Sequence, residues 1–300
     1  MSIMQRFWRL LVGLMISGGI LAGCQSKQPA ADTAKTNIVT TTDFYGSVAK
    51  AVGGKHVTVT SIINKPSVDP HDFEPTPAVA KTVSKADIVV ANGLGYDGWM
   101  NKVVRSTKQA KLIRVGEDVL HRKAGVNEHL WYDAQTMPAT ANYLAKQLAK
   151  QQPQYRAYFK ANAKRYIATL KPIQRERAKL QAKAKKMRQR QVLVSEPVFD
   201  YALTSLGFKV GNRDFENAVE KGTDPSPQVI HKMQRALKQR QVAFFVNNQQ
   251  VSDKLVANMV SLAKKNHVPV LSVTETMPAH LTYQQWMLKQ YRQLNQLLAD

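Results

Sequence analysis

The chain has 300 residues and carries 43 Lys and Arg against 21 Asp and Glu, a formal net charge of +22. Apolar residues make up 44% of the chain, an ordinary fraction for a folded protein, which excludes a largely disordered chain. The length exceeds what one typical hydrophobic core supports and indicates two domains.

The start of the chain has the pattern of an export signal. Arg6 and Arg9 precede an apolar run at 10–21, which ends in the sequence LAGC. The run has about a dozen residues, whereas a membrane-spanning helix needs roughly 20. Its ending resembles the lipobox of bacterial lipoproteins, whose cysteine is acylated. We therefore expect a lipoprotein signal peptide at 1–23 and lipidation at Cys24. The alternative is an ordinary signal peptide followed by a chance cysteine.

The part that follows the signal peptide is strongly basic. Residues 24–36 have no large apolar side chain and are expected to form a flexible tether. Outside a membrane, the positive charge would favour attachment to anionic lipid headgroups and anionic wall polymers. Export and the lack of a recognition motif argue against nucleic acid as a partner. The basic run at 171–190, with Glu176 as its one acid, indicates a solvated helix face.

Strand and helix patterns alternate after the tether, which is typical of a parallel α/β sheet. We expect an N-terminal α/β lobe at 37–152, and its chain is interrupted by a Pro-rich loop at 65–77. The strands expected in this lobe are 38–42, 57–63, 87–91 and 112–115, and the helices between them include 44–52 and 78–85.

A helical pattern then runs to residue 190 and separates the first lobe from a second one. We expect a long connecting helix at 153–190, of which 153–186 alone would span about 45 to 50 Å at 1.5 Å per residue. Pro172 predicts a kink or a boundary inside it. The alternation restarts in a C-terminal α/β lobe at 191–300. Its expected strands are 192–195, 208–211, 242–246 and 268–273, and its expected helices are 198–206, 228–240, 252–266 and 282–298.

Four residues that could bind a metal fall in loops after these strands: His71, His129, Glu196 and Glu275. Ligands of open α/β sheets bind beyond the carboxyl ends of the strands, and two of the four residues come from each lobe. The expected site therefore lies in the cleft between the lobes. Each residue alone is more often a surface histidine or a helix N-terminal acid, and spacing alone leaves that alternative open.

Two imidazoles and two carboxylates suit a divalent transition metal, since imidazole binds zinc and iron and carboxylate favours harder ions such as manganese. Four protein ligands with no open position would hold an ion rather than activate water, which favours binding over catalysis. There is also no Gly-rich phosphate loop and no Gly-x-Ser-x-Gly sequence to support nucleotide binding or triad hydrolysis.

Several motifs resemble those of one known family, the metal-binding lipoproteins that act as solute-binding proteins of bacterial manganese and zinc ABC transporters. The similar segments are DPHDFEPTP at 69–77, ANGLG at 91–95, HLW at 129–131, SE at 195–196 and TET at 274–276, and the likeness extends over 37–298. The resemblance implies two α/β lobes joined by a long rigid helix. It also implies that His71, His129, Glu196 and Glu275 are the metal ligands.

The chain departs from the family pattern at four places. Asn127-Glu128 stands where Asp-Pro is common before the second histidine, and Glu275 stands where the fourth ligand is often Asp. Glu196 replaces the third histidine of many zinc-specific members, and His121 is the only histidine at 116–128. The last two departures favour manganese. They do not exclude zinc, which binds more tightly than manganese at most sites with nitrogen and oxygen ligands.

The leading hypothesis is a lipid-anchored extracytoplasmic receptor that binds Mn²⁺ or Zn²⁺ and delivers it to an ABC permease for import. We expect a monomer, without catalytic residues, on the cell membrane of a Gram-positive bacterium. The alternatives are a surface adhesin or wall-interaction protein that uses the basic face, and a metal-dependent hydrolase with the same ligands. His121 and Glu128 are candidate auxiliary ligands, and candidates for orienting the histidines are Asp72, Glu74 and Asp224.

Overall fold

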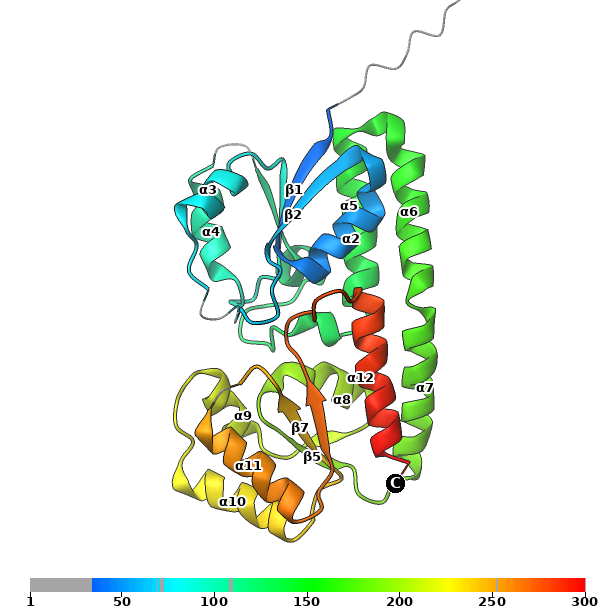
Figure 1. Ribbon diagram of the computed structural model, residues 1–300. Helices are drawn as coiled ribbons and strands as arrows, with labels where there is room; N and C mark the ends of the chain where they lie inside the picture. The colour runs from blue at the N-terminus through cyan, green and yellow to red at the C-terminus, as the bar shows by residue number, and fades with distance from the viewer. Residues whose placement is uncertain (1–33, 69, 71–72, 108–109, 252, 300) are drawn as a thin grey trace, which may run out of the picture. The chain divides into compact units, whose positions relative to one another are not determined.

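The computed structural model describes residues 34–68, 70, 73–107, 110–251 and 253–299 (Figure 1). Residues 35–300 form one compact unit that is separate from 1–34. The predicted signal peptide, Cys24 and His71 therefore lie outside the described residues. No helix in the described ranges is long and apolar enough to cross a bilayer.

The first half of the unit is a four-stranded parallel sheet with the strand order β2-β1-β3-β4. Its strands alternate with helices, as predicted. Side chains of alternating positions along β1 and β3 enter two different clusters: Ile38, Ile88 and Val90 face one cluster, whereas Val39 and Val89 face the other. The strands are β1 (Thr36–Thr42), β2 (Val57–Ile63), β3 (Ile88–Ala91) and β4 (Lys111–Arg114), and the helices are α2 (Asp43–Gly53), α3 (Pro77–Val83), α4 (Gly98–Arg105) and α5 (Thr136–Gln151).

The second half repeats the same strand order as β6-β5-β7-β8, again with parallel pairing throughout. The two faces of the sheet again belong to different clusters, because Val192 and Val194 face one and Leu193 faces the other. The strands are β5 (Gln191–Val194), β6 (Lys209–Val210), β7 (Phe245–Asn248) and β8 (Val270–Val273), and the helices are α8 (Asp200–Leu206), α9 (Arg213–Glu220), α10 (Pro227–Lys238), α11 (Lys254–Lys265) and α12 (Tyr283–Leu297).

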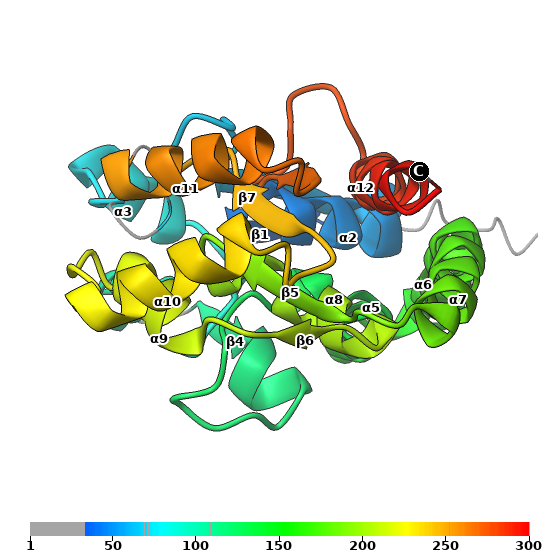
Figure 2. The same ribbon diagram turned by 90° about the horizontal axis from the view of Figure 1, so that it is seen from below.

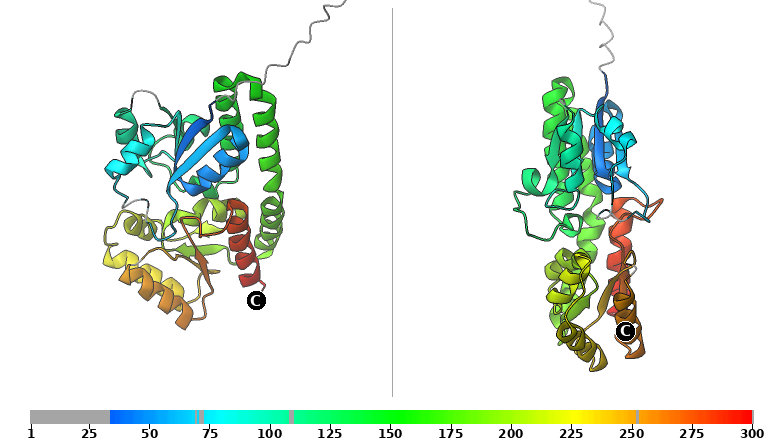
Figure 3. Two further views of the ribbon diagram at one scale, coloured as in Figure 1. Left: turned by 45° about the horizontal axis from the view of Figure 1, so that its top comes forward. Right: turned by 90° about the vertical axis from the view of Figure 1, so that its left-hand side faces the viewer.

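The predicted long connecting helix consists of two consecutive helices, α6 (Arg156–Thr169) and α7 (Lys171–Lys186). The break falls at Leu170, and Pro172 occupies the first turn of α7, where its missing N–H leaves no hydrogen bond unmade. The boundary that Pro172 predicted is therefore present. Seen from below, α6 and α7 overlie one another, and they run beside both sheets (Figures 2 and 3). Helix α6 packs against α2 and α5, and α7 packs against α8 and α12.

One hydrophobic cluster extends through both halves and joins them. It includes an aromatic series in which Phe44 contacts Trp131 at 4.8 Å between ring centroids, and Tyr132 contacts Phe199 at 4.9 Å and Trp286 at 5.8 Å. The two sheets thus share a core beside the α6–α7 column, which restricts their relative movement. The division into lobes at 152 and 190 stays a prediction.

Candidate functional site

Three of the four predicted ligands lie where the sequence places them, beyond the carboxyl ends of strands. Glu196 follows β5 by two residues and is partly buried, and Glu275 follows β8 by two residues and is 3% exposed. His129 is completely buried in the segment after β4. Within the described residues, no three His, Cys, Asp or Glu side chains gather closely enough to form a metal cluster. Because His71 lies outside that set, the four-ligand site stays a prediction.

The imidazole of His129 is oriented by Asn127. The Asn127 side-chain oxygen accepts a hydrogen bond from the backbone N–H of His129 at 2.8 Å. The same oxygen lies 2.9 Å from Nδ1 of the His129 ring. The amide nitrogen of Asn127 donates to the Pro197 carbonyl at 2.6 Å, which identifies the oxygen as the acceptor toward His129. In a neutral imidazole, Nδ1 therefore carries the proton and Nε2 keeps the lone pair that a metal requires.

The segment that carries His129 is attached to the turn after β3, where the sequence ANGLG lies. Gly93 and Gly95 have φ values of +81° and +104°, and a side chain at Gly93 would collide with the Glu117 carboxylate. Buried Asp97 closes this turn by accepting hydrogen bonds from the N–H groups of Asn92 and Gly93. The Asn92 amide then donates to the Glu128 carbonyl at 2.9 Å, directly before His129.

Glu220, the last residue of α9, lies beside the other ring nitrogen of His129. Its Oε1 is 3.6 Å from His129 Nε2, and its side chain is 13% exposed. Sequence reasoning missed Glu220 because it predicted no helix at 213–220. The position carries no motif that could have indicated a role. The carboxylate places negative charge at the nitrogen that is expected to bind the metal.

Glu275 is held through its backbone by Gln250 and through its carboxylate by Tyr96. The side-chain oxygen of Gln250 accepts hydrogen bonds from the N–H groups of Glu275 at 2.6 Å and Thr276 at 2.9 Å. Its amide nitrogen donates to the Pro66 carbonyl at 2.7 Å. The Tyr96 hydroxyl bonds the Glu275 carboxylate, and burial, followed by the charge of Glu275, raises the pKa of Tyr96 well above its usual value. Tyr96 therefore stays a neutral donor.

Glu196 is fixed by the end of the neighbouring strand. The Asn248 amide donates to Glu196 Oε2 at 2.9 Å, and the Asn248 N–H donates to the Ser195 hydroxyl at 2.9 Å. Asn248 is the last residue of β7 and is 3% exposed. A neutral amide thus orients the Glu196 carboxylate, and the neutral hydroxyl of Tyr96 orients that of Glu275. Neither partner cancels the charge of its carboxylate, which leaves both carboxylates able to attract a cation.

The other sequence candidates have different surroundings. Glu74, His121 and Asp224 are exposed, and Asp72 lies outside the described residues. The residues that position the candidate ligands are the amides Asn127, Asn248 and Gln250. Sequence reasoning missed these amides, because a single Asn or Gln in a loop gives no periodicity or spacing to detect.

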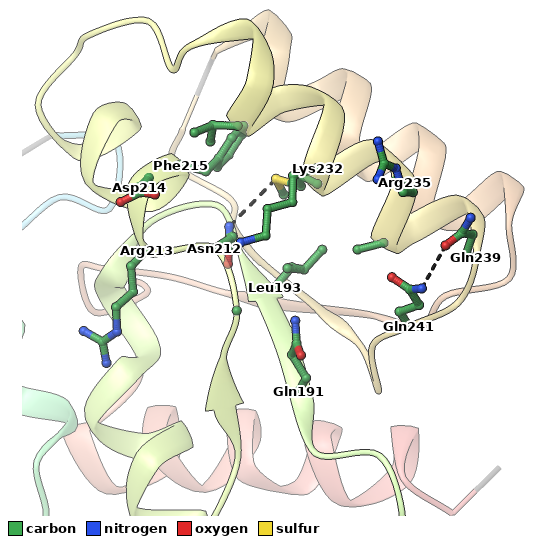
Figure 4. A pocket seen from close by; sticks show the side chains of 14 residues that line it. Gln191, Leu193, Asn212, Arg213, Asp214, Phe215, Lys232, Arg235, Gln239 and Gln241 are labelled. Atoms are coloured by element: carbon green, nitrogen blue, oxygen red, sulfur yellow. Dashed lines mark hydrogen bonds between the residues drawn. The ribbon is translucent and has the colours of Figure 1, made fainter.

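One hollow of about 480 Å³ lies between the two halves and borders the candidate site, and a second of the same volume lies within the second half. Asn127, Pro197, Asp200, Glu216 and Glu220 line the first, which therefore reaches the surroundings of His129. The second, shown in Figure 4, lies over β5 and beside α10 and contains none of the candidate ligands. The labelled residues that line this second hollow are Gln191, Leu193, Asn212, Arg213, Asp214, Phe215, Lys232, Arg235, Gln239 and Gln241.

Proteins of similar sequence include transporter components that are named for metals. The manganese-binding lipoprotein MntA of Halalkalibacterium halodurans is 26% identical over 216 residues, which cover 70% of this chain and 71% of the relative. The manganese ABC transporter substrate-binding lipoprotein PsaA of Streptococcus mitis is 26% identical over 273 residues, with 86% and 85% covered. The iron ABC transporter substrate-binding lipoprotein MtsA of Streptococcus pyogenes is 26% identical over 240 residues, with 75% and 77% covered.

Solved structures with the same fold confirm the predicted fold class. The manganese-bound periplasmic metal binding protein of Candidatus Liberibacter asiaticus superposes with a TM-score of 0.70 at 18% identity, covering 88% of this chain and 100% of its own. FpvC of P. aeruginosa, in complex with Ni²⁺, gives 0.71 at 21% identity, with 88% and 97% covered. Residues 38–297 match the family model described as zinc-uptake complex component A, periplasmic. The chain, with its two four-stranded sheets, therefore belongs to the zinc-uptake complex component A family.

Proposed function

We propose that the protein is an extracytoplasmic metal receptor that binds Mn²⁺ or Zn²⁺ through His71, His129, Glu196 and Glu275. The structural observation that carries the proposal is the orientation of His129. Its Nδ1 is engaged by Asn127, while its Nε2 is directed toward the Glu220 carboxylate 3.6 Å away. A histidine prepared in this way, beside buried acids, suits a divalent cation.

Both halves of the unit organise the site. Asn127 joins His129 of the first half to the carbonyl that follows Glu196 in the second half. Gln250 joins Glu275 of the second half to Pro66, which lies in the loop that leads to His71. Each amide therefore connects a ligand of its own half to the backbone of the other half. Ion binding between the halves should strengthen this arrangement, because a ligand stabilises the state that binds it.

The choice between the two ions depends on the oxygen ligands. Glu196 and Glu275 supply carboxylates, which suit manganese, whereas the proposed set holds no thiolate and has Glu196 in place of a third histidine, which weakens selectivity for zinc. The relatives are named for manganese and iron, and the structural neighbours include manganese, cadmium and nickel complexes. We therefore propose manganese as the transported ion, with zinc as a competitor.

The same proposal assigns the protein its place at the membrane. Acylated Cys24 would anchor it to the outer face of the cell membrane of a Gram-positive bacterium, where a single tether raises its concentration near the permease. The permease of a metal ABC transporter is then its partner, the ion is its cargo, and the receptor works as a monomer. A substrate-binding component of this kind needs no catalytic residue.

Thermal unfolding of residues 25–300 tests the proposal after the protein has been stripped of metal with a chelator. Saturating Mn²⁺ or Zn²⁺ should raise the midpoint by several degrees, because an ion at 100 times its Kd adds about 2.7 kcal/mol of stability. His71→Ala and Glu275→Ala should each lose most of the rise. His231→Ala, at an exposed position of α10, is the matched control and should keep it. The absence of a shift with either ion would overturn the proposal.

A further inference from the structure

Positive charge is concentrated in one segment of the chain. Residues 136–190 hold fifteen Lys and Arg but only one acid, Glu176, a net charge of +14 out of +22 for the chain. Glu176 is 7% exposed, and its carboxylate bonds Lys179 at 3.3 Å and Asn295 at 2.6 Å. The exposed surface of α5, α6 and α7 thus presents cations without acids among them.

These cations stand in positions that weaken the helices that carry them. Like charges four residues apart on a helix repel one another, and a solvated helix normally mixes both signs. A solvated helix face, as predicted for 171–190, explains why the cations are exposed. It does not explain why these helices carry only one acid. The like-charged pairs at this spacing are 146 and 150, 156 and 160, 160 and 164, 171 and 175, 175 and 179, and 179 and 183.

Four of the cations surround one groove between α5 and α6, which pack against each other (Figure 1). The groove has a volume of about 560 Å³, and its cations are Lys146, Lys150, Arg156 and Lys160. Ala145, Ala149 and Ala163, each less than 9% exposed, form part of its lining. The four cations form none of the ion pairs found among the described residues. A ligand that fits this groove combines anionic oxygens with a small apolar part.

The groove lies at the end of the unit where the described chain begins. The Gln152 amide donates to the Thr36 hydroxyl at 2.9 Å, and that hydroxyl donates to Gln151 at 3.2 Å, so β1 starts beside the end of α5. Cys24 and Ala34 are ten positions apart in the chain, with nine residues between them. Fully extended, this ten-position span reaches at most about 35 Å. A lipid on Cys24 would therefore keep the groove close to the membrane surface.

We propose that the groove between α5 and α6 binds anionic phospholipid headgroups at the membrane surface. Phosphate oxygens would pair with the four cations, the long lysine stems would lie along the alanines, and the glycerol part would enter between the helices. The membrane is the occupant because the predicted tether, 24–36, ends beside the groove, at Thr36. This inference rests on the proposed lipid anchoring but not on metal binding.

Vesicle sedimentation of unlipidated residues 25–300 tests the groove. The protein should bind phosphatidylglycerol-containing vesicles at least 10-fold more tightly than pure phosphatidylcholine vesicles, and 0.5 M salt should remove most of the difference. Changing all four groove cations to Gln should remove most of the binding to anionic vesicles. The control changes Lys209, Lys238, Lys264 and Lys265 to Gln, which removes the same charge from exposed positions of the second half and should reduce binding less than 3-fold.

Equal losses in the two variants would overturn the proposal, because binding would then follow net charge alone. Full displacement from vesicles by inorganic phosphate or soluble wall polymer at the same phosphate concentration would also overturn it and assign the groove to those anions. The metal-dependent rise in unfolding midpoint is measured on the same samples. If the unmodified sequence binds the vesicles but shows no metal-dependent rise in midpoint, the proposed metal receptor is wrong and the proposed lipid site is supported.

Discussion

The two halves of the molecule repeat one strand order but hold their candidate ligands differently. In the first half, Asn127 acts on the His129 ring itself and sets which nitrogen carries the proton. In the second half, Gln250 acts on the backbone of Glu275 and Thr276 and leaves the orientation of the carboxylate to Tyr96. The first amide therefore controls the protonation of a candidate ligand, whereas the second controls the position of a loop.

Replacing Asn127 should have the larger effect on metal binding. Asn127→Ala removes the acceptor of the His129 ring and the link to Pro197, and loss of such a partner lowers metal affinity by about 10- to 100-fold. Asn127→Asp keeps the acceptor, adds a negative charge beside the ring and should bind at least as tightly as the unchanged protein. Calorimetric titration with Mn²⁺ measures both variants. Equal affinities for the unchanged protein and the Ala variant would show that His129 needs no orienting partner.

Replacing Gln250 should affect stability more than affinity. Gln250→Ala leaves the buried N–H groups of Glu275 and Thr276 without their acceptor, a loss of about 1 to 3 kcal/mol. Affinity should fall less than 10-fold, because both carboxylate oxygens of Glu275 remain. Urea unfolding of the metal-free protein and Mn²⁺ titration separate the two effects. Gln249→Ala, at the preceding exposed position, is the control. If Gln250→Ala lost more Mn²⁺ affinity than Asn127→Ala, Gln250 would act on the metal ligand and not only on the position of the loop.

The sequence predicted the strands of both halves because their apolar runs alternate with helical segments, and it predicted the helix boundary because Pro172 cannot continue α6 without strain. It failed at α9, a short helix between Gly211 and Gly222, and therefore failed at Glu220. It also missed the two connecting amides. Asn127 bonds a residue 70 positions away and Gln250 one 184 positions away, so their partners are defined only by the packed halves.

The halves also differ in how they accommodate buried acids. Burial raises the pKa of Asp97 in the first half. The Asp97 carboxylate accepts two backbone N–H bonds, at 2.6 and 2.9 Å, which lower the pKa and partly offset that rise. In the second half, Asp200 and Glu216 hydrogen-bond each other near Arg213. Burial raises the pKa of Asp200 to about 7 and that of Glu216 to about 8. Near neutral pH the pair holds a proton that the unfolded chain would release.

The smallest expected effect is a pH dependence of stability that comes from the second half. Because both pKa values are raised by folding, the folded state binds more protons between about pH 4 and 8, and this pair lowers stability as the pH rises through that range. Glu216→Gln keeps a donor for Asp200 but removes one titrating group. Its unfolding midpoint should therefore fall less than that of the unchanged protein between pH 5 and 8.5, by a few degrees. Asp214→Asn removes an exposed acid from the same helix and should leave the slope unchanged. If the unfolding midpoints of the two variants change equally with pH, Glu216 ionises in the folded protein as it does in the unfolded chain. The buried acids of the second half would then not make stability depend on pH.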